Sequence, residues 1–253
     1  MRVRVTRPAP DAPDWVAALR RRGFDAVSVP LIAIAPAPDP SSIHAAWQRL
    51  AARRAAMFVS GNAVRQFFSA GPPDAAWPAG VRAWATGPGT RAALLQAGVP
   101  DAAIDLPPPE SLQFDSEHLW HVVAPQIRNG DEVLVVRGAD ASGEMGRDWL
   151  AGQLQTAGAR ADQVVVYARA MPVWTAAQRQ EALAGADAGG WLFSSSQAVR
   201  HLQALLPGQT WARARAVATH ARIARAARGA GFGVVCESRA DLGAIAAALE
   251  SIR

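Results

Sequence analysis

Residues 58–65 read Phe-Val-Ser-Gly-Asn-Ala-Val-Arg, and residues 193–200 repeat the pattern as Phe-Ser-Ser-Ser-Gln-Ala-Val-Arg. Each copy begins at the end of an apolar run, passes through small polar residues and continues with helical spacing. A short apolar strand that leads directly into a helix is the building unit of parallel α/β sheets. Because the unit recurs, with Ser60 matching Ser195 and Asn62 matching Gln197, the sequence predicts two related α/β lobes.

The surrounding chain extends this repeat. Residues 83–87 (Ala-Trp-Ala-Thr-Gly) match residues 216–220 (Ala-Val-Ala-Thr-His), and a glycine follows each at a similar distance. Ten apolar runs alternate with amphipathic stretches, which is too many strands for one compact sheet but fits two parallel sheets of five, each flanked by helices. The expected strands are Val3–Thr6, Ala26–Ile34, Ala56–Ser60, Val81–Ala85, Ile104–Leu106, Glu132–Arg137, Gln163–Tyr167, Gly190–Ser194, Arg215–Ala218 and Gly233–Glu237.

Composition excludes several classes of chemistry. The sequence has no lysine, which excludes a protein-linked Schiff base and a Walker A phosphate loop. The single cysteine, Cys236, excludes an internal disulfide, a cysteine-based zinc site and an iron–sulfur cluster. No apolar run is long enough to span a bilayer, and the N-terminus lacks the apolar core of a signal peptide. We therefore expect a cytoplasmic protein that binds no membrane.

The net charge of +5 favours anionic partners, either nucleic acid or a polycarboxylate. The arginines gather in patterns typical of solvated helix faces, without the interleaved aromatic residues of a single-strand binding groove, so we expect no nucleic acid. His118 and His121 are one helical turn apart, but no carboxylate stands beside them at a metal-binding spacing, and we expect no metal. The inventory predicts no cofactor.

Small polar residues recur where the predicted strands end. They are Thr6, Ser60, Thr86, Gly138, Ser194, Ser195, Ser196 and Thr219. In open α/β sheets the ligand crevice lies at the carboxyl ends of the strands, and helices that begin there carry partial positive charge. Any one of these hydroxyls can be a simple helix cap. Their recurrence in both repeats favours a site made of hydroxyls and backbone amides, which suits a ligand with carboxylates.

Over nearly its whole length the chain resembles the uroporphyrinogen-III synthase family. In order, the matching pieces are Val5–Pro8, Pro30–Ile32, Ser60–Val64, Gly87–Thr90, Val133–Gly138 with Arg147 and Leu150, Gly158–Ala159, Val165–Arg169, and Phe193–Ser195 with Ala198–Val199. One departure concerns the second repeat, where the family often has Gly-x-x-Thr. His220 and Ile223 occupy those positions here, so either Thr219 or His220 stands in for the missing threonine.

The resemblance implies a particular chain path. Domain one consists of residues 1–33 and 171–253, and residues 39–163 form a second domain inserted into it. Residues 34–38 and 164–170 form a two-stranded antiparallel linker, and each of these stretches lies in an extended, proline-ended segment. We expect two similar lobes that move as rigid bodies, in a monomeric protein.

The resemblance also implies the reaction. A member of this family closes hydroxymethylbilane, a linear tetrapyrrole with acetate and propionate arms, into uroporphyrinogen III in porphyrin and heme biosynthesis. The last pyrrole ring is inverted, water is lost and no cofactor takes part, in a cleft between the lobes. The residues expected to bind the substrate are Thr6, Arg7, Ser60, Gly61, Asn62, Gly87, Thr90, Arg137, Gly138, Arg147, Ser195, Ser196, Thr219 and His220.

Tyr167, the only tyrosine, is the expected catalytic residue. It stands where the seventh expected strand becomes the linker, and its phenol can donate a hydrogen bond to the departing hydroxyl. The alternative is a structural residue that packs the hinge. Arg7 and Arg147 likewise have a structural alternative. For the protein as a whole, the alternative is a non-catalytic hinged protein that binds or senses a small anion, because fold alone does not determine function.

Overall fold

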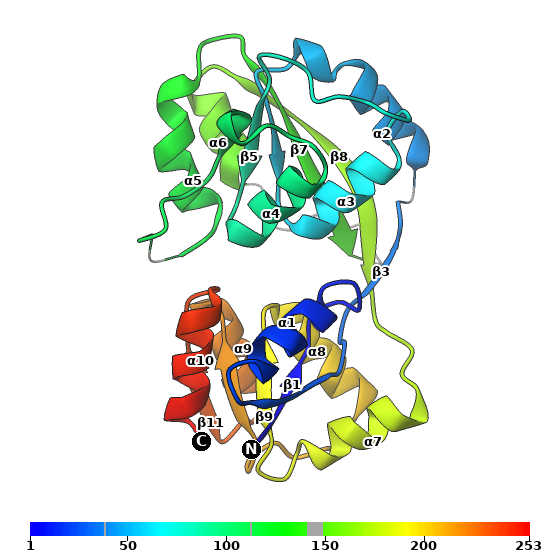
Figure 1. Ribbon diagram of the computed structural model, residues 1–253, viewed down its shortest axis with the longest axis vertical. Helices are drawn as coiled ribbons and strands as arrows, with labels where there is room; N and C mark the ends of the chain where they lie inside the picture. The colour runs from blue at the N-terminus through cyan, green and yellow to red at the C-terminus, as the bar shows by residue number, and fades with distance from the viewer. Residues whose placement is uncertain (38, 112, 141–148) are drawn as a thin grey trace. The chain divides into compact units, whose positions relative to one another are not determined.

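The computed structural model describes residues 1–37, 39–111, 113–140 and 149–253. The chain divides into two compact units (Figure 1). Unit 1 consists of Met1–Ala33 and Ala170–Arg253, and unit 2 of Ile34–Arg169. Within the described residues, no helix is both long and apolar enough to cross a membrane. Each unit is a largely parallel sheet with helices on both faces, which confirms the predicted fold class.

Unit 1 contains a five-stranded sheet in the order β11-β10-β9-β1-β2, and every neighbouring pair is parallel. The strands are β1 (Arg2–Val5), β2 (Asp25–Ser28), β9 (Gly190–Phe193), β10 (Arg215–Ala218) and β11 (Val234–Glu237). The helices are α1 (Ala12–Arg20), α7 (Ala176–Ala184), α8 (Ser196–Leu205), α9 (Ala221–Gly229) and α10 (Leu242–Ser251).

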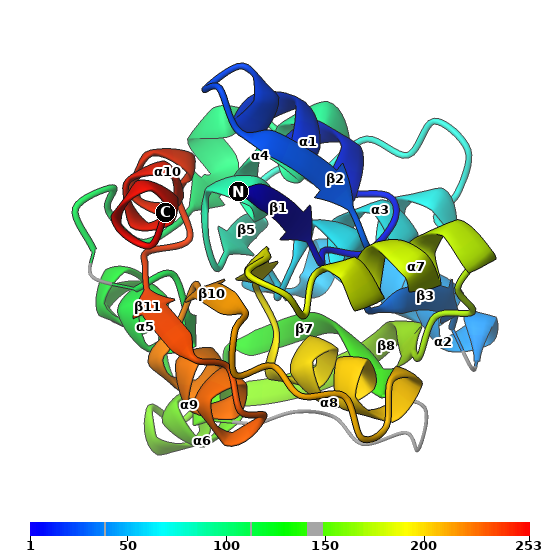
Figure 2. The same ribbon diagram turned by 90° about the horizontal axis from the view of Figure 1, so that it is seen from below.

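The unit 1 sheet buries both faces. Figure 2 shows α1 and α10 on one face and α8 and α9 on the other. Leu192 of β9 packs with the α1 and α10 side chains, whereas its neighbours Trp191 and Phe193 point to the opposite face and stack on each other. Alternate residues of a strand point to opposite faces, so one short strand supplies apolar side chains to two cores.

Unit 2 contains a six-stranded sheet in the order β3-β8-β7-β4-β5-β6. The strands are β3 (Ala33–Pro36), β4 (Ala55–Phe58), β5 (Arg82–Ala85), β6 (Ile104–Asp105), β7 (Glu132–Asp140) and β8 (Arg160–Ala170). The α-helices are α2 (Pro40–Gln48), α3 (Gly61–Ser69), α4 (Pro88–Gln96), α5 (Ser116–Val123) and α6 (Trp149–Thr156). The described residues also include the short 3₁₀ helices η1 (Leu50–Ala52), η2 (Asp101–Ala103) and η3 (Ala124–Gln126). The five strands from β8 to β6 are parallel, and β3 adds an edge strand beside β8. The expectation of five strands is therefore wrong for this sheet, because residues assigned to the linker pair with β8 as a sixth strand.

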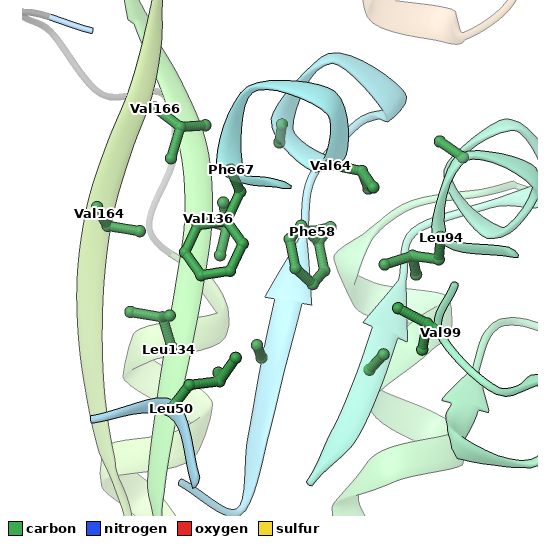
Figure 3. Close-up of a cluster of buried hydrophobic side chains, with 14 of the residues drawn as sticks. Leu50, Phe58, Val64, Phe67, Leu94, Val99, Leu134, Val136, Val164 and Val166 are labelled. Carbon is green, nitrogen blue, oxygen red and sulfur yellow. The ribbon is translucent and has the colours of Figure 1, made fainter. Parts of the chain in front are cut away.

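The same alternation fills two cores in unit 2. Phe58 of β4 and Val136 of β7 point toward α3, where they meet Phe67 and Val64 (Figure 3). The intervening residues Met57 and Val135 pack with α5 and α6 on the opposite face. Burial of this kind stabilises by roughly 25 cal/mol per Å² of apolar surface. The two cores hold β4 and β7 rigidly at the centre of the sheet.

The expected strand Ala26–Ile34 is wrong as one element. It is divided into β2, which ends at Ser28, and β3, which begins at Ala33, and these strands belong to different sheets. Pro30 lies between them and has no N–H to donate to a ladder. The connecting residues are held instead by two backbone hydrogen bonds, from Val29 N–H to the Val5 carbonyl and from Leu31 N–H to the Thr6 carbonyl.

Candidate functional site

Each sheet has a place where two neighbouring strands lead to helices on opposite faces. In unit 2, β4 leads to α3 on one face, whereas its neighbour β7 precedes α6 on the other. In unit 1, β1 leads to α1 and its neighbour β9 leads to α8 on the opposite face. Ligands of open α/β sheets bind at the carboxyl edge beside such a switch point, because the diverging connections leave a crevice there. Ser60 and Gly138 lie at the first point, and Thr6 and Ser195 at the second.

At the unit 2 switch point, Ser60 is the N-cap of α3. Its Oγ accepts a hydrogen bond from the backbone N–H of Ala63, with 3.1 Å between the two atoms. Gly61 and Asn62 form the first turn of the helix, and Asn62 is buried with its Oδ1 accepting from Arg65 at 2.9 Å. Asn62 is therefore engaged within its own helix.

Tyr167 belongs to the same place. Its side chain is only 4% exposed, and its hydroxyl lies 3.2 Å from Ser60 Oγ. The pairing of β7 with β8 shifts between Arg137 and Gly138, so that Val165 faces Arg137 but Tyr167 faces Gly138. Val166 is the extra residue of this β-bulge. Gly138 lies directly against the Tyr167 ring, which occupies the space that a side chain at residue 138 would need.

Two further predicted residues of unit 2 are buried beside this edge. Arg137 is 7% exposed, and its guanidinium donates to Gln163 Oε1 at 3.1 Å. Gln163 was not predicted, and no sequence pattern marks it as a partner of Arg137. Thr90 is also buried, within α4, and its backbone N–H bonds to the carbonyl of Gly87, the N-cap of that helix. Arg147 lies outside the described residues.

At the unit 1 switch point, the predicted serines and threonine have different surroundings. Thr6 is buried, and its hydroxyl donates to the Leu192 carbonyl at 2.7 Å, which ties β1 to β9. Ser195 is the N-cap of α8, with Oγ accepting from the N–H of Gln197 at 3.2 Å. Ser196 Oγ is buried and forms no hydrogen bond within the described residues. A buried hydroxyl without a hydrogen-bond partner is costly to stability.

Arg7 follows Thr6 and is stacked on an aromatic ring. Its guanidinium carbon lies 4.0 Å from the centre of the Trp15 ring, in a cation–π contact. Its Nε is buried and has no hydrogen-bond partner among the described residues. Burial, opposed in part by the charge of Asp11, lowers the pKa of Arg7 to about 10. The guanidinium remains charged at neutral pH and is poorly compensated, which suits it to a carboxylate.

Thr219 and His220 of unit 1 occupy the positions that Thr86 and Gly87 have in the matching segment of unit 2. Thr219 is 6% exposed, and its backbone N–H bonds to the Phe193 carbonyl at 3.1 Å. His220 is the N-cap of α9, and its Nδ1 accepts from the N–H of Arg222 at 3.1 Å. His220 therefore takes the position of Gly87 in the first repeat. Ile223, which occupies the position of Thr90, is buried in the helix.

The structure brings the predicted residues together within each unit. Tyr167 contacts both Ser60 and Gly138 in unit 2, and Thr6 and Thr219 bond to successive carbonyls of β9 in unit 1. The described residues contain no group of His, Cys, Asp or Glu that could hold a metal ion. Two surface hollows, of about 280 Å³ beside Trp15 and about 360 Å³ beside Arg53, include none of the predicted residues.

Comparison with known proteins identifies the family. The family model described as uroporphyrinogen-III synthase HemD matches residues 13–247. The chain belongs to the uroporphyrinogen-III synthase family. This confirms the resemblance on which the sequence interpretation rested, and it places the chain in a family of tetrapyrrole biosynthesis enzymes. A search of curated protein sequences found no match.

Solved structures of uroporphyrinogen-III synthase family members have the same fold. A mutant uroporphyrinogen III synthase from the extremely thermophilic bacterium Thermus thermophilus is 19% identical, with a TM-score of 0.57, and the match covers 100% of this chain and 98% of that one. The uroporphyrinogen-III synthetase from Helicobacter pylori 26695 is 16% identical, with a TM-score of 0.60, and both chains are covered completely. At these identities the similarity establishes the two-sheet α/β fold.

Proposed function

We propose that this chain converts hydroxymethylbilane to uroporphyrinogen III, with inversion of the last pyrrole ring and loss of water. The observation that carries the proposal is the family match over residues 13–247. The chemistry of the two carboxyl edges supports it. The acetate and propionate arms of the linear tetrapyrrole are anionic at neutral pH, and both edges present cationic or N–H donors suited to such arms.

The proposed work of the protein is mainly positioning. A flexible linear tetrapyrrole closes spontaneously to the symmetric isomer, so the enzyme must hold the last ring for attack from its substituted carbon. In this proposal Arg7 and Ser196 of unit 1 bind carboxylates, because Arg7 Nε and Ser196 Oγ lack partners among the described residues. The first turns of α3 and α8, capped by Ser60 and Ser195, add partial positive charge.

Loss of the hydroxyl requires a hydrogen-bond donor at the departing oxygen. We assign that task to the Ser60 and Tyr167 hydroxyls, which lie 3.2 Å apart at the unit 2 switch point. Neither group needs a metal or an oxidant to act as a donor, and such assistance typically contributes about 10²-fold to a rate. The remainder of the acceleration comes from orientation of the substrate.

The test is incubation with hydroxymethylbilane followed by oxidation and chromatographic separation of the porphyrin isomers. We expect mostly isomer III, formed faster than spontaneous closure. Formation of isomer I alone, at the uncatalysed rate, contradicts the proposal. Tight binding of hydroxymethylbilane without any change of its closure rate or product identifies a binding protein instead.

A further inference from the structure

The position of Tyr167 raises a question about which hydroxyl meets the substrate. The side chain is 4% exposed, so its phenol is enclosed by protein. Gly138 and the bulge in β8 set the ring in this place, because a side chain at residue 138 would overlap it. Ser60 lies beside the hydroxyl and is only partly buried. Of the two residues, Ser60 is the more exposed.

The hydrogen bonds of the pair have one favourable direction. Ser60 Oγ already accepts from the Ala63 N–H at 3.1 Å, and it can accept a second bond. If Ser60 donated to Tyr167, the phenolic proton would be buried without a partner among the described residues, which is costly. If Tyr167 donates to Ser60, every buried donor of the pair is satisfied. The Ser60 hydroxyl proton then has no acceptor within the pair, and Ser60 is the more exposed of the two residues.

We propose that Ser60 is the group that donates a hydrogen bond to the departing hydroxyl, and that Tyr167 is a positioning residue which acts through Ser60. This inference rests on the proposed function and reverses the roles expected from the sequence. Two fixed hydrogen bonds, from Ala63 N–H and from the Tyr167 hydroxyl, occupy the Ser60 lone pairs and direct its proton outward. No proton is transferred between the two side chains.

A double-mutant cycle separates this arrangement from two independent donors. We expect Ser60→Ala to lower kcat about 10²-fold and Tyr167→Phe about 10-fold, with little change in KM for either variant. The double variant should match Ser60→Ala within about 2-fold, because Tyr167 has no route to the substrate once Ser60 has lost its hydroxyl. Losses that multiply in the double variant overturn the inference. Ser60→Thr, which keeps both the hydroxyl and the cap, should restore most of the rate.

Because Tyr167 is the only tyrosine, 3-fluorotyrosine labelling gives a single ¹⁹F resonance from the site. Ser60→Ala should shift this resonance, since the phenol loses its hydrogen-bond acceptor. An unchanged resonance contradicts the bond and overturns the inference. Thr175→Ala is the matched control, because Thr175 caps α7 with its hydroxyl outside the site. It should lower Tm as Ser60→Ala does, while kcat is unchanged.

These results distinguish two kinds of failure. If the parent protein forms no isomer III, the proposed function fails before any variant is compared. If the parent is active but Tyr167→Phe affects turnover equally in the presence and absence of the Ser60 hydroxyl, only the assignment of roles fails. A higher fraction of isomer I from Ser60→Ala than from Tyr167→Phe supports Ser60 as the direct donor, because spontaneous closure competes most when the enzyme is slowest.

Discussion

The space at Gly138 determines where the Tyr167 ring lies. A Cβ there would overlap the ring, and β7 is buried on both sides, so neither strand can move aside cheaply. We expect Gly138→Ala to destabilise the fold by about 1–3 kcal/mol through overpacking and to lower kcat by moving Tyr167 away from Ser60. Urea unfolding and isomer analysis measure the two effects.

Gly152 provides the control for this substitution. It lies inside α6, and nothing is within 4 Å of the position that its Cβ would take. Gly152→Ala should stabilise the protein by about 0.5–1 kcal/mol, because alanine loses less backbone freedom than glycine in a helix. If both substitutions prove equally harmless, the role given to Gly138 is wrong.

Burial of the Arg7 guanidinium lowers the stability of the folded chain. Burial lowers its pKa to about 10, so the charged form is less favourable in the folded chain than in the unfolded one. The unfolded chain therefore holds more protons once the pH rises above about 10, and Arg7's cost to stability is fully present at neutral pH and fades only as the pH rises past that value. We expect Arg7→Met to raise Tm at pH 7 and to raise KM for hydroxymethylbilane.

The comparison variant is Arg22→Met, since Arg22 is exposed in the turn after α1. Its Tm and KM should equal those of the parent. A lower Tm for Arg7→Met would mean that the stacking on Trp15 outweighs the cost of burying the charge, and an unchanged KM would remove Arg7 from the substrate site.

At the scale of elements, helix starts were predictable and strand register was not. The repeat in the sequence matched Ser60 with Ser195, and both prove to be N-caps, because a cap bonds to an N–H only two or three residues away. The Ser60–Tyr167 bond joins residues 107 positions apart and depends on a one-residue bulge in β8. Sequence placed Tyr167 at a strand end but contained no sign that its hydroxyl would be enclosed.

His220 has a structural role that the family motif did not predict. The motif predicted a substrate-binding residue in place of the family glycine, and the structure shows a cap made by imidazole Nδ1. We expect His220→Ala to lower the free energy of unfolding by about 1 kcal/mol, and His220→Asp to restore it, because a carboxylate both accepts the Arg222 N–H and interacts favourably with the helix dipole. Urea titration at pH 7 measures both. Equal stability of all three proteins contradicts the capping role.

At the scale of the whole molecule, the chain path makes unit 2 an insertion. The chain enters it through β3 and leaves it through β8, and these strands are neighbours in one sheet. In unit 1, the two chain segments that flank the insertion are joined by a hydrogen bond from Trp174 Nε1 to the Pro30 carbonyl, 2.8 Å long. The alternating apolar runs predicted two sheets because the side chains of each run fill the cores of its own unit. They did not predict that residues 26–34 are divided between the two sheets, because that division depends on Pro30.

The insertion should therefore fold by itself. Residues 33–170 include all six strands of their sheet and both of its cores, and their length is typical of an independent domain. We expect the excised segment to unfold cooperatively by calorimetry and to keep the Ser60–Tyr167 contact, seen as a ¹⁹F resonance like that of the full chain.

Residues 1–32 joined to 171–253 by a short glycine–serine linker should also fold, since Pro30 and Trp174 are already in contact. A shorter segment, residues 39–163, loses β3 and the end of β8 that carries Tyr167, and it should unfold at a lower temperature. If the 33–170 segment is unfolded while the full chain is stable, the two units stabilise each other and do not fold independently.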